Sequence, residues 1–223
     1  MVIRYFNGLG QNRAWHDQGK IAEVRAYWEA LRQDGQLPHR QQIDPRGIAG
    51  ALDHTFLIER IGTGLAQVRI AGMVFHDLMG MDLCGMPLSA MFLAEARLQL
   101  QMALERMFHG PACLSLTLRS PASMGREALK ARMIALPLRG ASGLGLGQNG
   151  GSTMALGCLE VAGTIARQPR RFMIDTTDVT RIAVPDDQPD DLVVPTGALA
   201  PVPAQPATHP APHPYLRLVH SAP

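Results

Sequence analysis

The sequence has few cysteines and no long apolar run, and each shortage excludes a class of protein. Its cysteines, Cys84, Cys113 and Cys158, are odd in number and widely spaced in apolar surroundings. They predict reduced, small core residues rather than a disulfide framework or a zinc cluster. No stretch approaches the roughly 18 apolar residues of a membrane-spanning helix, and the first residues lack the pattern of a secretory signal. We therefore expect a cytoplasmic protein that does not bind a membrane.

An excess of one charge is also missing. The chain has 21 Lys plus Arg against 19 Asp plus Glu, a formal net charge of +2, and only Lys20 and Lys130 are lysines. Nucleic-acid binding depends on many clustered cations, so we expect no nucleic-acid partner. Hydrophobic residues are 46% of the 223, which is enough for the core of one medium domain.

Familiar catalytic motifs are absent as well: there is no nucleophile elbow, phosphate loop or zinc-protease helix. The segment Gly145–Gly150 matches the dinucleotide motif G-x-G-x-x-G literally, but that motif requires a following helix and an acidic residue about twenty positions later. A strand-like run follows instead; Glu160 comes too early and Asp175 too late, while Asn149-Gly150 favours a hairpin turn. We predict that the chain is not an enzyme. The alternative is a small nucleotide- or dinucleotide-binding enzyme that uses this glycine loop.

Composition divides the chain into four parts. Residues 1–36 form an N-terminal extension with a flanking helix over Asp17 to Gly35, and 37–166 form the main domain. Residues 167–184 read as a linker, in which Arg167, Arg170 and Arg171 are expected to be solvated. Residues 185–223 hold ten of the seventeen prolines and predict a disordered Pro/Ala-rich tail.

The main domain alternates between strand and helix patterns. After a short helix announced by Asp44-Pro45, the expected order is a hairpin of strands over 54–61 and 66–71, short helices over 72–92, a long amphipathic helix over 93–108, and strands over 112–118, 131–138 and 153–161. Pro137 indicates that its strand ends or lies at an edge there. We predict an α+β fold: a five-stranded antiparallel sheet with the short helices and the long helix on one face.

This order of elements resembles the PAS domain, whose five-stranded antiparallel sheet is interrupted after the second strand by helices. The likeness extends to short motifs of a bacterial, alphaproteobacterial-type variant and covers roughly Val24 to Ile165. The motifs are Leu37-Pro38, Ile43-Asp44-Pro45, Phe56-Leu-Ile, Val68-Arg69-Ile70-Ala71-Gly72, Leu78-Met-Gly80, Asp82-Leu and Gly85. The resemblance implies a stand-alone sensory or protein-interaction module of bacterial signalling that acts through a partner, and a cavity between sheet and helices.

The cavity would take a small apolar organic ligand or be filled by side chains. Neither haem nor flavin is expected, because the long helix lacks a histidine and Cys84 lacks the neighbours of a flavin-binding cysteine. No metal is expected either. The domain's many methionines suit an adaptable apolar pocket, and equally an ordinary core. The candidate lining residues are Phe75, His76, Leu78, Met91, Leu104, Leu114 and Leu116.

The flanking helix carries the candidate interface, Val24, Tyr27, Trp28 and Leu31. Aromatic anchors dominate protein interfaces, so these residues favour a homodimer or a signalling-protein partner; covering the chain's own sheet is the alternative use. Arg69, charged within an apolar strand, is expected to bond Asp77 or Asp82, or simply to lie on an exposed strand face.

Overall fold

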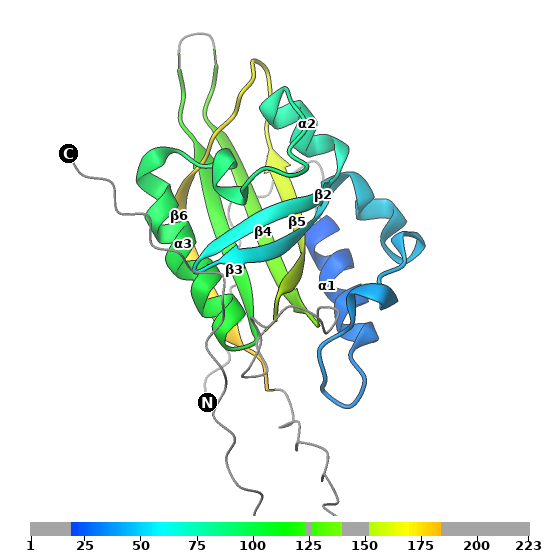
Figure 1. The fold of residues 1–223 in the computed structure, drawn as a ribbon. Coiled ribbons are helices and arrows are strands. Elements are labelled where there is room, and N and C mark those ends of the chain that lie inside the picture. Colours follow the sequence, from blue (N-terminus) through cyan, green and yellow to red (C-terminus); the bar gives the residue numbers. More distant parts are fainter. Residues whose placement is uncertain (1–18, 124–125, 140–151, 184–223) are drawn as a thin grey trace, which may run out of the picture. The chain divides into compact units, whose positions relative to one another are not determined.

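The fold is an α+β arrangement built on one antiparallel sheet, described by a computed structural model for residues 19–123, 126–139 and 152–183 (Figure 1). The sheet has six strands in the order β2-β1-β5-β4-β3-β6, and every neighbouring pair is antiparallel. The strands are β1 (Thr55–Gly62), β2 (Leu65–Ala71), β3 (Ala112–Ser120), β4 (Leu129–Leu138), β5 (Met154–Ala162) and β6 (Met173–Arg181). The helices are α1 (Lys20–Leu31), α2 (Met73–Met79) and α3 (Ala94–His109), with 3₁₀ segments η1 (Arg40–Gln42), η2 (Pro45–His54) and η3 (Leu88–Met91). Within these described ranges, no helix is both long and apolar enough to cross a membrane.

All five predicted strands form, with the predicted helices between β2 and β3. β3 shows why the pattern was readable: Leu114, Leu116 and Leu118 are buried on one face, while Thr117 and Arg119, on the other face, are exposed. Successive side chains of a strand point to opposite faces, so this alternation fixes which face of β3 meets the helices.

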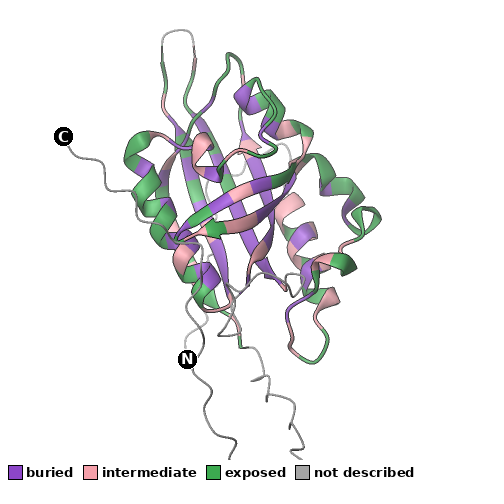
Figure 2. Cartoon of the chain, in the orientation of Figure 1, coloured by how far each residue is buried: buried purple, intermediate pink, exposed green. Residues whose placement is uncertain are grey.

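Each face of the sheet carries its own hydrophobic core. On the inner face, residues of α2, η3 and α3 pack with the sheet. On the outer face, α1 and η2 pack mainly over β1, β4 and β5. The expectation of helices on one face therefore holds for α2 and α3, and the flanking helix covers the other face. Figure 2 shows the buried strands between helices whose outward sides are exposed.

Pro137 does not mark an edge, as its position had suggested. β4 lies between β5 and β3, and Pro137 pairs with Ala155 of β5. The ladder with β3 stops at Ala135, so Pro137, which lacks an N–H, falls where that side of β4 is unpaired. The strand ends one residue later, at Leu138.

The predicted linker was wrong, because most of 167–184 belongs to the fold. β6 pairs with β3 from Ala112 to Arg119, and Ile174 is buried against the inner core. Arg170 is 1% exposed rather than solvated: its guanidinium donates to the carbonyl oxygens of Ile165, Glu127 and Thr164 at 2.6–3.3 Å. Asp17, the Gly145–Gly150 segment and the predicted tail 185–223 lie outside the described residues.

Candidate functional site

Six of the seven predicted cavity residues meet in the inner hydrophobic core. Phe75, Leu78, Met91, Leu104, Leu114 and Leu116 are all buried in one cluster. At its centre Phe75 packs edge-on against Phe56, with ring centroids 5.3 Å apart. The Phe56 ring lies so close over Gly157 that a Cβ there would stand 2.1 Å from Phe56 Cζ. The lack of a side chain at Gly157 therefore leaves the space that the Phe56 ring occupies.

His76 is the exception among the seven, because its side chain is exposed on α2. On this two-turn helix the neighbours Phe75, Leu78 and Met79 take the buried positions, which leaves His76 on the solvent side. The prediction that it lines a cavity is wrong.

The predicted interface on α1 is largely used inside the chain. Val24 and Trp28 are 0% exposed in the outer core, and Trp28 Nε1 donates to the carbonyl oxygen of Pro137 at 2.9 Å. The hydroxyl of half-buried Tyr27 accepts from the backbone N–H of Asp44 at 2.7 Å. Leu31 is half-buried. The aromatic side chains cover the chain's own sheet and η2, so they are not available as anchors for a partner.

A groove of about 950 Å³ opens beside α1 on the outer face of the sheet. Its lining comes from α1, β3, β4, β5 and β6, and it is rich in polar and charged side chains. Those side chains are Arg25, Ser115, Thr117, Arg132, Glu160, Thr176 and Asp178, with Ile21 and Ala22 at the helix. The predicted interface residues thus lie mainly on the buried side of α1, whereas the side next to the groove carries Ile21, Ala22 and Arg25.

One carboxylate anchors the groove where α1 begins. Glu160 is 1% exposed, and its Oε1 accepts from the backbone N–H groups of Gly19 and Ile21 at 3.2 and 2.9 Å. Its Oε2 accepts from Arg132 at 2.6 Å. Because α1 has no side-chain cap of its own, Glu160 satisfies helix N–H groups that local sequence leaves unpaired. Glu160, which the sequence raised only in connection with the dinucleotide motif, therefore has a structural role: it links β5 to the start of α1.

The outer face also buries a thiol. Cys113 is 7% exposed, and burial raises the pKa of its thiol, an effect that Arg25 opposes by Coulomb attraction. Cys84, by contrast, is exposed, so the prediction that it is a core residue is wrong.

Arg69 lies on an exposed strand face as expected, but it pairs with Glu59 of the neighbouring strand rather than with an aspartate.

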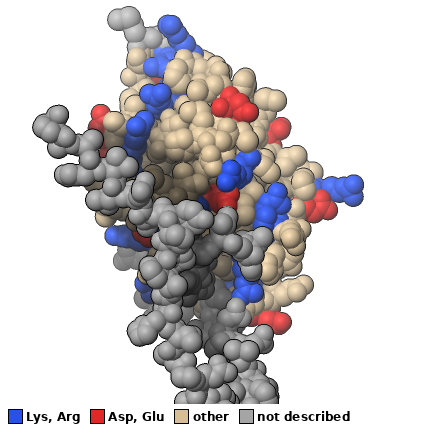
Figure 3. Space-filling view, viewed as in Figure 1, with Lys and Arg blue, Asp and Glu red and all other residues tan. Residues whose placement is uncertain are grey.

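Figure 3 shows cationic and anionic side chains interspersed over one face, with neutral residues covering most of it. In the described part of the chain, no three His, Cys, Asp or Glu side chains gather as a metal site. The glycine loop connects β4 to β5, which pair antiparallel up to Leu138 and Met154, so a strand stands where the dinucleotide motif needs a helix.

Comparison with known proteins adds one finding. A family model described as PAS domain matches residues 17–151, more than half of the chain. The match includes α1, β1 to β4 and all the helices between them, and it ends before β5. No curated protein and no solved structure matches the chain.

Proposed function

Because the chain belongs to the PAS domain family, which comprises sensory and interaction modules, we propose that it acts in cytoplasmic bacterial signalling by binding a protein partner in the outer-face groove, and that the first partner is a second copy of itself. The observation that carries this proposal is the groove, which opens beside α1 and combines charged and hydroxyl side chains with an apolar floor that includes Leu116, Met133 and Ile134.

The charges of the groove favour a second copy over an arbitrary partner. Arg25 and Arg132 line it together with Asp178, so both signs are present. In a two-fold dimer each patch meets itself, and a patch with one sign of charge would repel its copy. The exposed hydroxyls of Thr117 and Thr176 add hydrogen-bonding groups between the charges.

The test is a steric and charge block at Thr117, which lines the groove. Thr117→Arg places a long cation on the exposed outer side of β3 and should convert a dimer to a monomer in size-exclusion chromatography with light scattering. The matched control is Leu98→Arg. Leu98 is exposed on α3, the helix that packs on the inner face of the sheet. A monomeric wild type, or equal effects of both variants, would overturn the proposal.

A small apolar ligand in the inner core is the second candidate, favoured by the buried methionines Met79, Met91, Met107 and Met133. Methionine side chains are flexible enough to repack around a guest, so these residues suit an adaptable apolar site. Native mass spectrometry would reveal such a guest as added mass. Neither haem nor flavin belongs to this proposal, and a visible absorbance band in the purified protein would contradict it.

A further inference from the structure

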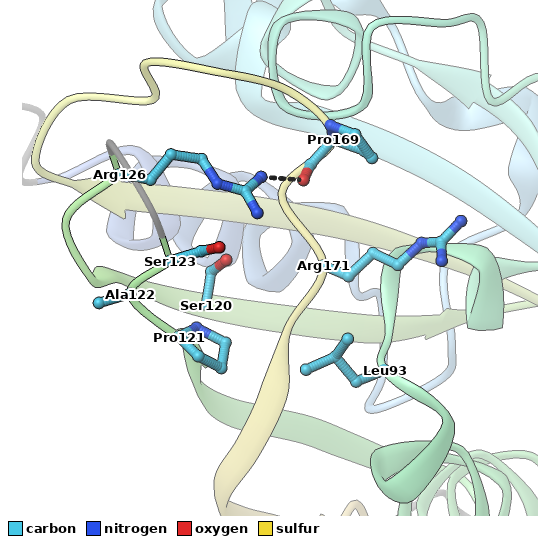
Figure 4. A pocket seen from close by; sticks show the side chains of 8 residues that line it. All are labelled: Leu93, Ser120, Pro121, Ala122, Ser123, Arg126, Pro169 and Arg171. Carbon is cyan, nitrogen blue, oxygen red and sulfur yellow. Dashed lines mark hydrogen bonds between the residues drawn. The ribbon is translucent and has the colours of Figure 1, made fainter.

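A second concave site lies at the C-terminal end of β3 and shares no lining residue with the groove. Its volume is about 340 Å³, and three segments meet there: the end of β3 with the loop after it, the residue before α3, and the residues before β6. The lining residues are Leu93, Ser120, Pro121, Ala122, Ser123, Arg126, Pro169 and Arg171 (Figure 4).

Backbone hydrogen bonds fix these segments together. The N–H of Leu93 donates to the carbonyl oxygen of Phe172 at 3.0 Å, and the N–H of Phe172 donates to that of Met91 at 2.9 Å. Across the loop, Ser123 and Arg126 exchange two backbone hydrogen bonds of 3.1 and 2.8 Å. The pocket walls are therefore held in place before anything binds, which lowers the entropic cost of binding.

Ser120 supplies a hydroxyl that has no hydrogen-bond partner among the described residues. The residue is 4% exposed and lines the pocket. Figure 4 shows its side chain beside that of Ser123, below the guanidinium of Arg126. Among the described residues, the only unpartnered side-chain N or O atom shut off from solvent is Arg60 Nε, so the Ser120 hydroxyl keeps its access to the pocket. It is free to donate to an acceptor that binds there.

Arg126 reaches over the serines with most of its donors unused. Its Nη1 donates to the carbonyl oxygens of Pro169 and Arg167 at 2.9 and 3.3 Å. Those two bonds hold the side chain in position, while Nε and Nη2 make no hydrogen bond within the described part of the chain. A guanidinium presents paired donors that match the two oxygens of a carboxylate or phosphate.

Positive charge is concentrated around this pocket. Arg171 lines it from the other side, extending away from the serines in Figure 4, and none of the described lining residues is acidic. Buried Arg170 lies nearby, and its pKa is lowered first by burial and then by the charge of Arg126. α3 begins at Ala94, and its N-cap residue Leu93 supplies no side-chain cap, so the partial positive charge of the helix N-terminus adds to the field.

We propose that this pocket binds a small organic anion, whose carboxylate or phosphate group is held by Arg126 and the hydroxyls of Ser120 and Ser123. The apolar part of the ligand would lie against Leu93 and the adjoining prolines. The site is independent of the outer-face groove, so it gives the module a small-molecule input apart from its protein partner.

The test is an NMR titration of the full chain with three probes of similar shape: benzoate, phenyl phosphate and neutral benzamide. Both anions should shift the amide signals of Ser120 and Arg126, and benzamide should not. Stronger binding of phenyl phosphate assigns a phosphate group, and stronger binding of benzoate assigns a carboxylate. Equal shifts with benzamide, or no shift with either anion, would overturn the proposal.

Variants localise the binding. Arg126→Gln and Ser120→Ala should each weaken the anion at least ~tenfold, the scale of one charge-assisted hydrogen bond, and Arg126→Lys should recover part of the loss. Arg119→Gln is the matched control, because this exposed arginine lies next to Ser120 in β3, pairs with Asp175 and does not line the pocket. If Arg126→Gln does not fold, Arg171→Gln removes a cation that makes no hydrogen bond among the described residues. Unchanged affinity in both Ser120→Ala and the foldable arginine variant would refute the site.

Discussion

Glu160 on β5 accepts a hydrogen bond from the backbone N–H of Ile21 on α1 at 2.9 Å, across 139 residues of sequence. The carboxylate is 1% exposed and also bonds Gly19 and Arg132. It fixes where the flanking helix starts, and therefore where the groove beside that helix begins. A small change at this carboxylate should thus be felt in both stability and partner binding.

Glu160→Gln keeps the size of the side chain but removes its charge and one of its two acceptor oxygens. We expect the free energy of unfolding, measured by urea denaturation, to fall by about 1–3 kcal/mol, the usual cost of losing hydrogen bonds to a buried charged group. Glu127→Gln, at an exposed position, is the control. Equal free energies of unfolding for Glu160→Gln and Glu127→Gln would show that the hydrogen bonds of Glu160 contribute nothing to stability.

Trp28→Phe removes the indole N–H that bonds the Pro137 carbonyl and leaves an aromatic ring in the outer core. We expect a loss of about 1–2 kcal/mol in unfolding free energy and no change in oligomeric state, since Trp28 is buried within its own chain. Dissociation of a dimer without loss of stability would restore Trp28 as an interface anchor.

Gly157→Ala forces a methyl group into the ring of Phe56, 2.1 Å from Cζ. Overpacking of this kind costs about 1–3 kcal/mol, and Phe56→Leu in the same chain should recover part of that cost. Gly110→Ala is the matched control, because a Cβ at Gly110 meets nothing within 4 Å. If Gly157→Ala and Gly110→Ala both unfold at the melting temperature of the wild type, the close packing of Phe56 over Gly157 is contradicted.

The Cys113 thiol should make stability depend on alkaline pH. Burial raises its pKa in the folded chain, so the folded state holds the proton more tightly than the unfolded state. Its contribution is fully present below the unfolded-state pKa of about 8.5 and is lost as pH rises through the higher folded-state value. The free energy of unfolding relative to Cys113→Ala should therefore begin to decline above the unfolded-state pKa of about 8.5. A difference that stays flat from neutral to alkaline pH contradicts the raised pKa.

Residue patterns predicted the five PAS strands because each has a strongly apolar side, as in the leucines of β3. β6 escaped prediction because its middle reads Asp175, Thr176, Thr177 and Asp178. It is an edge strand whose outer side meets solvent and whose inner side buries little beyond Ile174. Such a strand is stabilised mainly by its backbone hydrogen bonds with β3, and no local sequence pattern reveals that pairing.

The groove was missed for a related reason. The polar residues between the leucines of β3, Ser115 and Thr117, signalled an exposed strand side, but Arg25, Arg132 and Asp178 join them from three other elements. The sequence predicted a flanking helix at α1 without telling which of its sides meets the chain's own sheet. Trp28 looked like an interface anchor because a large aromatic residue suits a core and an interface equally well.

The most direct test of the proposed function is native mass spectrometry of the unmodified full chain over a range of protein concentrations. Self-association through the outer-face groove predicts a dimer mass that grows with concentration and disappears in Thr117→Arg. A monomer mass at every concentration, or a dimer that Thr117→Arg leaves intact, would contradict it.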